Sequence, residues 1–210
     1  MIRRARYPAA FLARHPLRAA RNLVGNHPSA LADRYLRGLR GVEIGGAANN
    51  DFFLNTVNVD YQAVPSTHAA QLRHAGRSMT VDVIAAADAL PFADKSYDFV
   101  LASHVLEHMP DPIAALEDWS RVARRFVLVI LPQPTNEFDA GRELSTPGEL
   151  IERHRARLAS DQDRHWSVWS SGSFGELCRR IGLDVIEVQD PDDKRGNGFA
   201  VVVAAGGAPR

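Results

Sequence analysis

The residues with the clearest chemical potential are His104, Glu107 and His108, which form the pattern H-x-x-E-H in the stretch ASHVLEHMPDP. Two imidazoles and a carboxylate at this spacing can ligate a divalent cation. Alternatively, one imidazole can act as a general base, because its ordinary pKa lies close to neutral pH. His165 stands in a polar stretch further along the chain and is a candidate to join this group as a catalytic residue.

The same pattern is the signature of one group of zinc peptidases, in which both histidines lie on one continuous helix. This sequence offers no such helix, because YDFVLAS (97–103) is typical of a strand that stops at Ser103, and MPDP follows His108. One helical turn remains, so we exclude a peptidase. Three interpretations stay open: Glu107 and His108 cap the turn, His104 or His108 is a general base, or His104, Glu107 and His108 bind a cation.

The elements that must position these residues alternate between short apolar runs and amphipathic stretches. Strands joined by helices indicate right-handed crossovers and a parallel sheet. We therefore predict an α/β, Rossmann-like, doubly wound sheet of seven strands, mostly parallel, with an antiparallel edge hairpin and helices on both faces. We expect strands at 41–46, 56–61, 79–84, 97–103, 126–132 and 198–205, and a helix at 113–124. The stretch 173–188 is expected to begin as a helix and to end as a further strand.

The distribution of charged and polar residues predicts the domain organisation. The chain of 210 residues carries no net charge, but residues 1–40 hold nine arginines and a single aspartate. We predict a basic helical arm at 1–40 and one domain at 41–210, with a polar insertion at 133–170 that acts as a substrate-binding lid. The single cysteine, Cys178, fits a reducing cytoplasm, and no apolar run is long enough to span a membrane.

A nucleoside site is expected where the first two strands end. Glu43 and Asp60 fall near the ends of successive strands, and the carboxyl ends of parallel strands line the ligand crevice of such a sheet. An acid at the end of the second strand can accept hydrogen bonds from both hydroxyls of a ribose. The sequence has neither G-x-G-x-x-G nor a Walker lysine after this turn, so the nucleoside is expected to carry no phosphate.

The stretches VEIGGAANN and ALPFADKSYDFVLASHVLEH resemble those of class I S-adenosylmethionine-dependent methyltransferases of the type 11-like branch. The likeness is strong over 38–132 and covers 171–205 in outline. It implies S-adenosyl-L-methionine as cofactor, with the methionine part on the glycine turn, the ribose on the second strand's end, the adenine on the loop 87–92, and the sulfonium above the end of the fourth strand. The residues implied are Glu43, Gly45, Gly46, Ala47, Asp60, Tyr61, Asp88, Ala89, Leu90, Ser103 and His104.

Two features depart from that family's pattern. Its loop usually reads G-x-G-x-G, whereas this chain has Gly45, Ala47 and Asn49 at those places. The acid that usually contacts the adenine is replaced by Ala86, and Asp88 follows two residues later. Asp88 then either reaches the adenine amine through a shifted loop or serves as a helix cap or solvated side chain.

A second resemblance concerns the metal. Small-RNA and ubiquinone-pathway O-methyltransferases carry E-x-x-E-H, in which the outer acids and the histidine bind a cation. His104 replaces the first glutamate here, which softens the set of ligands, so that either Mg²⁺ or Mn²⁺ remains a candidate.

The acceptor is expected to be a hydroxyl, because a hydroxyl needs a base or a metal to become a nucleophile. A polar lid with Trp166 and Trp169 suits a small molecule or oligosaccharide whose ring stacks on indole. The lid also resembles that of actinobacterial enzymes that methylate mannose-containing polysaccharides. The alternatives are that both tryptophans pack the lid on the sheet and that His165 only bonds a nearby acid, Asp161 or Asp163.

Other functions remain to be weighed. A silent methyltransferase-fold protein could bind nucleic acid or a partner through the arginine-rich arm, and an active one could methylate RNA ribose. The zero net charge argues against a nucleic-acid partner. The sequence is compatible with a homodimer.

Overall fold

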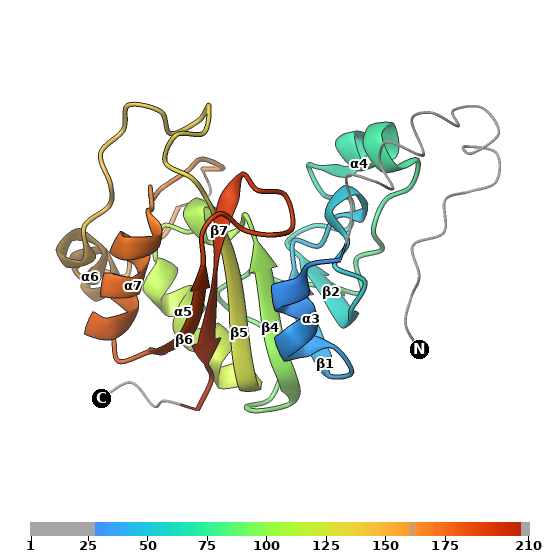
Figure 1. Ribbon diagram of the computed structural model, residues 1–210, viewed down its shortest axis with the longest axis horizontal. Coiled ribbons are helices and arrows are strands. Elements are labelled where there is room, and N and C mark those ends of the chain that lie inside the picture. The colour runs from blue at the N-terminus through green and yellow to red at the C-terminus, as the bar shows by residue number, and fades with distance from the viewer. Residues whose placement is uncertain (1–27, 161, 207–210) are drawn as a thin grey trace.

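The computed structural model describes residues 28–160 and 162–206, which form a seven-stranded sheet in the order β3-β2-β1-β4-β5-β7-β6 (Figure 1). Strands β1 to β5 are parallel, and β7 runs antiparallel to both β5 and β6. The predicted sheet with its antiparallel edge hairpin is confirmed. The strands span Arg40–Ile44 (β1), Asn55–Asp60 (β2), Val83–Ile84 (β3), Tyr97–Ser103 (β4), Ala123–Pro132 (β5), Asp184–Gln189 (β6) and Gly198–Ala204 (β7).

The helices begin where the sequence provides caps. The Asp111 carboxylate accepts a hydrogen bond from the Ala114 N–H (3.0 Å) just before α5, and Pro112 occupies the first turn, where its missing N–H costs nothing. Ser170 and Ser173 form a reciprocal capping box at α7. The helices span Ala30–Leu36 (α3), His68–Ala75 (α4), Pro112–Val122 (α5), Pro147–Arg155 (α6) and Ser171–Arg180 (α7), with 3₁₀ turns at Ala48–Asn50 (η1) and Leu106–His108 (η2).

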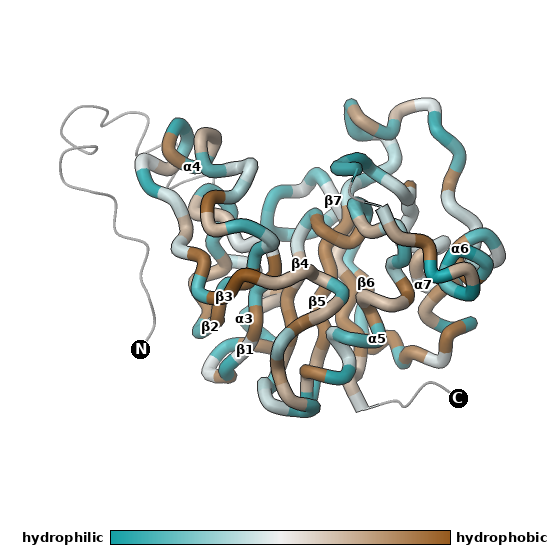
Figure 2. The backbone as a smooth tube through the Cα atoms, turned by 180° about the vertical axis from the view of Figure 1, so that it is seen from behind, coloured by the Kyte–Doolittle hydropathy of each residue, from teal (hydrophilic) through white to brown (hydrophobic). Residues whose placement is uncertain are grey.

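The central strands of the sheet are buried on both faces. Alternate residues of β4 point to opposite sides, so that Val100 and Ala102 join the core beneath α5, α6 and α7, whereas Phe99 and Leu101 pack with α3. Apolar residues accordingly concentrate in the central strands (Figure 2). The arrangement explains why β5 reads as a continuous apolar run rather than an alternating one.

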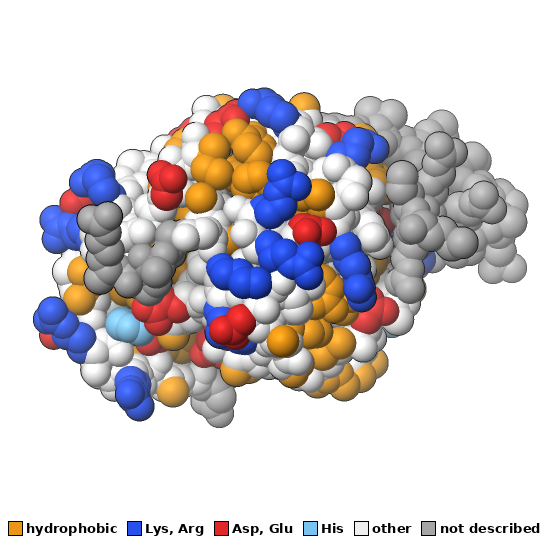
Figure 3. Space-filling model, turned by 90° about the horizontal axis from the view of Figure 1, so that it is seen from below, with side chains coloured by type: hydrophobic (Ala, Val, Ile, Leu, Met, Phe, Trp, Pro, Cys, Tyr) orange, Lys and Arg blue, Asp and Glu red, His pale blue; other side chains and the backbone are white. Residues whose placement is uncertain are grey.

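The amino ends of the parallel strands form a basic face. Arginine side chains gather there with acidic side chains between them (Figure 3). Arg37 pairs with Asp33, and Arg124 pairs with Asp98 at 3.5 Å. This face lies opposite the carboxyl ends of the strands, where ligands of doubly wound sheets bind.

The predicted arm is described only in part, since residues 1–27 lie outside the described residues. Its last segment, α3, packs on the sheet through Leu31, Ala32 and Leu36, so at least that segment belongs to the core of the domain. Within 28–160 and 162–206, every helix is too short or too polar to cross a lipid bilayer.

Candidate functional site

A cavity of about 480 Å³ opens at the carboxyl ends of the parallel strands. Strand ends, the loop after β2, the loop after β3 and the lid residues 158–160 and 162–163 contribute to its wall. The cavity therefore occupies the place where the sequence predicts a nucleoside. Of the predicted residues, it is lined by Gly45, Asp60, Tyr61, Asp88, His104 and His108.

The turn after β1 is built for close approach of a ligand. Gly45 has φ +65°, a left-handed conformation that residues with a Cβ rarely adopt, and its N–H donates to the Val59 carbonyl at 2.8 Å. The Gly46 N–H donates to Asn58 Oδ1 (2.9 Å), and a Cβ at Gly46 would lie only 2.6 Å from that oxygen. A side chain would therefore strain the backbone at Gly45 and clash at Gly46, so both positions require glycine. Ala47 fits without strain.

Asp60 ends β2 with an unused acceptor. The residue is 9% exposed, and its Oδ1 atom is buried without a hydrogen-bond partner in the structure. Burial raises the pKa of this carboxyl, and hydrogen bonds from the Gln62 and Tyr61 backbone oppose that effect. Because a buried carboxylate oxygen without a partner is costly, Asp60 fits a ligand that donates a hydrogen bond, such as a ribose hydroxyl.

Glu43 lies behind the turn rather than on the cavity wall. The residue is 5% exposed, and Glu43 Oε2 accepts a hydrogen bond from Thr56 Oγ1 at 3.0 Å. Burial raises the pKa of Glu43 to about 7; Asp51 adds to the rise, and Thr56 and Lys194 oppose it. Its position supports the backbone of the glycine turn instead of contacting a ligand in the cavity.

This pKa makes fold stability depend on pH. The unfolded carboxyl ionises near its ordinary value whereas the folded one holds its proton to about pH 7, so stability falls as pH rises through that window. Glu43→Gln is expected to remove the dependence and to be more stable than the parent at pH 8 by up to about 3 kcal/mol.

Urea unfolding at pH 5, 6 and 8 measures the effect, with Glu152→Gln as the control because Glu152 is exposed on α6. Parallel stability curves for the parent and the Glu43→Gln variant would contradict the assignment.

The loop 87–92 is held from behind by α5. The Leu90 N–H donates to Asp118 (2.8 Å), and Trp119 Nε1 donates to the Ala87 carbonyl (2.7 Å). Arg121 donates to the Leu90 carbonyl at 3.0 Å. Leu90 is consequently buried against the helix, and neither Leu90 nor Ala89 lines the cavity, whereas Asp88 does.

His104 adopts a strained backbone at the end of β4. Its φ is +55°, and such left-handed non-glycine residues cluster at functional sites. Its N–H donates to the Ile130 carbonyl (2.9 Å), which continues the β4–β5 ladder past Ser103. Ser103 does not line the cavity. Its Oγ accepts a hydrogen bond from Asn50 Nδ2 (3.2 Å).

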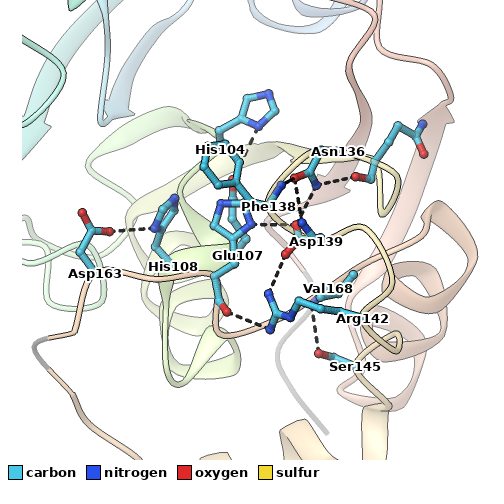
Figure 4. Close-up of polar contacts among 12 residues, drawn as sticks. His104, Glu107, His108, Asn136, Phe138, Asp139, Arg142, Ser145, Asp163 and Val168 are labelled. Atoms are coloured by element: carbon cyan, nitrogen blue, oxygen red, sulfur yellow. Dashed lines mark hydrogen bonds and ion pairs between the residues drawn. The ribbon is translucent and has the colours of Figure 1, made fainter.

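Glu107, His108 and His165 form one group, and His108 also lines the cavity. Figure 4 labels Glu107 and His108 of this group. One ligand atom from each of the three lies within 4.8 Å of the others, and the two imidazoles meet edge to face at 4.7 Å. Glu107 is 1% exposed and its Oε2 is buried without a partner. His104 Nδ1 lies 3.6 Å from Glu107 Oε1, but the group whose ligand atoms all lie within 4.8 Å of one another contains the lid residue His165 rather than His104.

Acidic residues orient both histidines. His108 Nδ1 lies 2.9 Å from Asp163, and His165 Nδ1 lies 2.7 Å from Asp139. Burial raises the pKa of Asp139, but hydrogen bonds from Asn136 and His165 outweigh it and the pKa is lowered overall. Paired in this way, each imidazole leaves Nε2 for a proton or a metal. From the sequence, Asp161 or Asp163 is the expected partner of His165, but its partner in the structure is Asp139; Asp161 lies outside the described residues.

The two lid tryptophans differ in burial: Trp169 lies in the core, whereas Trp166 is half-buried with an arginine over its ring. Trp169 is 1% exposed and packs on Phe174 in the core, and the Arg164 guanidinium lies 3.6 Å from the centre of the Trp166 ring. Phe138 is instead the exposed aromatic beside the histidines: it is 71% exposed, and its ring centre lies 5.5 Å from that of His165. Its N–H donates to Asn136 Oδ1 (2.8 Å), so the turn that carries Asp139 also fixes Phe138 (Figure 4).

Comparison with known proteins agrees with this geometry. A family model described as a methyltransferase domain matches residues 16–188. A SAM-dependent methyltransferase from Aquifex aeolicus is 14% identical with a TM-score of 0.53, covering 95% of this chain and 100% of that one. A SAM-dependent methyltransferase from Thermotoga maritima, described as a possible histamine N-methyltransferase, is 17% identical with a TM-score of 0.51, covering 93% and 99%. No curated protein matches the sequence.

Proposed function

Because the chain belongs to the family of S-adenosylmethionine-dependent methyltransferase domains, we propose that it transfers the methyl group to a hydroxyl, and that this hydroxyl belongs to a saccharide. The observation that carries the first part is the cluster of Glu107, His108 and His165 beside the cavity. A protonated hydroxyl is a poor nucleophile, and these groups are the ones that could activate it.

In this proposal the methyl donor occupies the cavity and supplies an electrophilic methyl group. Asp60 accepts hydrogen bonds from its ribose, and the turn at Gly45 and Gly46 lets its methionine part approach the backbone. Asp88 is the cavity acid nearest in sequence to the expected adenine loop. The unpartnered Oδ1 atom of Asp60 and the left-handed turn at Gly45 support this placement.

Hydroxyl activation is assigned to the cluster, as ligands of Mg²⁺ or Mn²⁺. Three observations support a cation: the three ligand atoms lie within 4.8 Å, Glu107 Oε2 is buried without a partner, and each imidazole is backed by a carboxylate. Carboxylate–histidine pairs of this kind orient metal ligands. The second candidate is metal-free, with His108 as general base and Asp163 orienting its ring, and it rests on the 2.9 Å contact between them.

Binding of the saccharide that accepts the methyl group is assigned to the lid. Its polar side chains are largely engaged with one another, as in the bonds of Asn136 and Arg142 to Asp139. The free surface beside the histidines is therefore the Phe138 ring, on which the apolar face of a sugar could stack while a hydroxyl on its rim meets His108. The choice of a saccharide rests on this platform and on the likeness of the lid in sequence.

Two measurements test the proposal in order. Calorimetric titration with S-adenosylhomocysteine is expected to show binding, and no binding at about 1 mM would remove the cavity assignment. Methyl-donor turnover is then measured on mannose and glucose oligosaccharides, with catechol, phospholipid and RNA in parallel. Turnover on catechol, phospholipid or RNA alone would refute the saccharide. Donor binding without any turnover would favour the silent binding module.

A further inference from the structure

The loop between β6 and β7, residues 190–197, reaches across the top of the sheet to the segment 47–53 that follows β1 (Figure 1). Arg195 donates to the carbonyl of Asn49 and, at 3.3 Å, to Asn50 Oδ1. Lys194 Nζ donates to the Asp51 carbonyl at 2.5 Å. Two consecutive cations from the carboxyl-terminal hairpin therefore hold the segment that continues the glycine turn.

Lys194 is buried to an extent that is rare for lysine. It is 1% exposed, and its ammonium lies 4.9 Å from the Phe52 ring centre and 5.1 Å from that of Phe53. Burying an ammonium is costly unless it is paired or rests on aromatic faces. The Asp51 and Glu43 carboxylates attract the same ammonium electrostatically, so the Lys194 side chain is held by both hydrogen bonding and charge.

The hairpin that presents these cations is rigid. Asp192 is 3% exposed, and its carboxylate accepts hydrogen bonds from the N–H groups of Lys194 (3.0 Å), Arg195 (2.7 Å) and Gly198 (2.8 Å). Asp193 accepts from the Leu31 N–H at 3.0 Å, which ties the same loop to α3. The loop therefore has a fixed shape before any ligand arrives.

The segment 47–53 directly follows the glycine turn, and its other contacts reach β4 and α4. Asn50 Nδ2 donates to Ser103 Oγ at the end of β4, and the Ala48 N–H donates to Gln71 Oε1 (2.9 Å). A shift of this segment would therefore move both the glycine turn and the contact with the strand that ends at His104. We propose that Lys194 and Arg195 are positioning residues that hold the segment 47–53 in the shape that binds the methyl donor.

This inference rests on the proposed placement of the donor at the glycine turn, and it predicts an effect on donor affinity rather than on fold alone. Lys194→Met keeps the buried stem but removes the charge, and it is expected to weaken S-adenosylhomocysteine binding about tenfold at pH 7.5. Arg195→Ala changes an exposed residue, so it is expected to leave the unfolding temperature unchanged while weakening binding roughly threefold. Arg180→Ala, on the outer side of α7, is the matched control and is expected to bind as the parent does.

The pH profile separates positioning from simple loss of stability. Burial lowers the pKa of Lys194 to about 8; Arg195 also lowers it, whereas Asp51, Glu43 and Asp193 raise it, and Asp51 is itself paired with Arg77. The parent is therefore expected to lose affinity between pH 7.5 and 9.5, since the ammonium is discharged there. The Lys194→Met variant should lack this component, and subtracting its profile removes titration of the ligand itself.

Calorimetry on the parent decides first whether the donor binds at all; if it does not, the proposed function fails. If the parent binds while both variants bind within twofold of it and share its pH profile, the positioning role is refuted. A variant that unfolds at lower temperature yet binds with parental affinity well below that temperature would likewise assign Lys194 to stability alone.

Discussion

Replacing Asp60 by alanine is expected to weaken the binding of S-adenosylhomocysteine by about a hundredfold. The estimate follows from the loss of two hydrogen bonds to a charged acceptor, each worth roughly 1.5–3 kcal/mol before partial replacement by water. The Oδ1 atom of Asp60 is buried and unpartnered, so its removal relieves a cost in the unliganded protein, whereas the Tyr61 and Gln62 backbone N–H groups lose the carboxylate as acceptor. These two effects oppose each other, so the unfolding temperature of the variant is expected to change little.

The Asp60→Asn variant is expected to show an intermediate loss of affinity. The amide keeps one acceptor and the shape of the side chain, so a loss of about tenfold is expected. Asp184→Ala, exposed at the start of β6, serves as the control. Equal affinity of Asp60→Ala and the parent would show that the ribose does not lie at the end of β2, and the cavity would need another ligand.

The sheet could be predicted because its signals are local. Strand runs such as FVLVILP are apolar throughout, as burial on both faces requires, and β5 is indeed buried over Val127–Pro132. The boundaries differ most at the expected third strand, 79–84, which spans only Val83–Ile84. The residues before it bond to Asn58 through side-chain as well as backbone contacts: the Asn58 N–H donates to the Asp82 carboxylate, Asn58 Nδ2 donates to the Thr80 carbonyl, and the Asp82 N–H donates to the Asn58 carbonyl.

Only those site residues could be predicted that belong to a local motif at the end of a strand. The strand ends place Gly45, Asp60 and His104 on the cavity, because parallel strands bring their carboxyl ends together. Asp139 and Lys194 could not be found in this way. Each acts across a long sequence separation, Asp139 on His165 and Lys194 on Asp51, and the pattern around each shows only a polar turn. A polar lid likewise does not reveal which indole is buried: Trp169 packs in the core, as the packing alternative predicts, whereas stacking on Trp166 stays a prediction.

His108 is expected to matter for turnover rather than for donor binding. His108→Ala should lower kcat by roughly 10²–10⁴, the usual contribution of a general base or of a group that activates a nucleophile. Binding of S-adenosylhomocysteine should stay within about threefold, because the donor's charged contacts are assigned to β1 and β2 rather than to η2. His154→Gln is the matched control, since His154 also pairs with an aspartate, Asp111 at 3.0 Å, but lies between α5 and α6 away from the cavity. Comparable losses of turnover and donor affinity would place His108 in the architecture of the turn.

A metal and a base leave different signatures on the same residues. If Glu107, His108 and His165 hold a cation, chelation abolishes turnover, Mn²⁺ or Mg²⁺ restores it, and His165→Ala weakens Mn²⁺ binding measured directly by calorimetry. Asp139→Asn should then weaken Mn²⁺ by about 10–100-fold as well, because it orients a ligand without being one. If His108 is a base alone, activity survives EDTA, and His165→Ala costs little because His165 would only pack against the base. Turnover that is insensitive to EDTA would remove the cation, and with it the explanation for a buried glutamate, Glu107, that has one unpartnered oxygen and a carboxylate oxygen within 4.8 Å of two imidazole nitrogens.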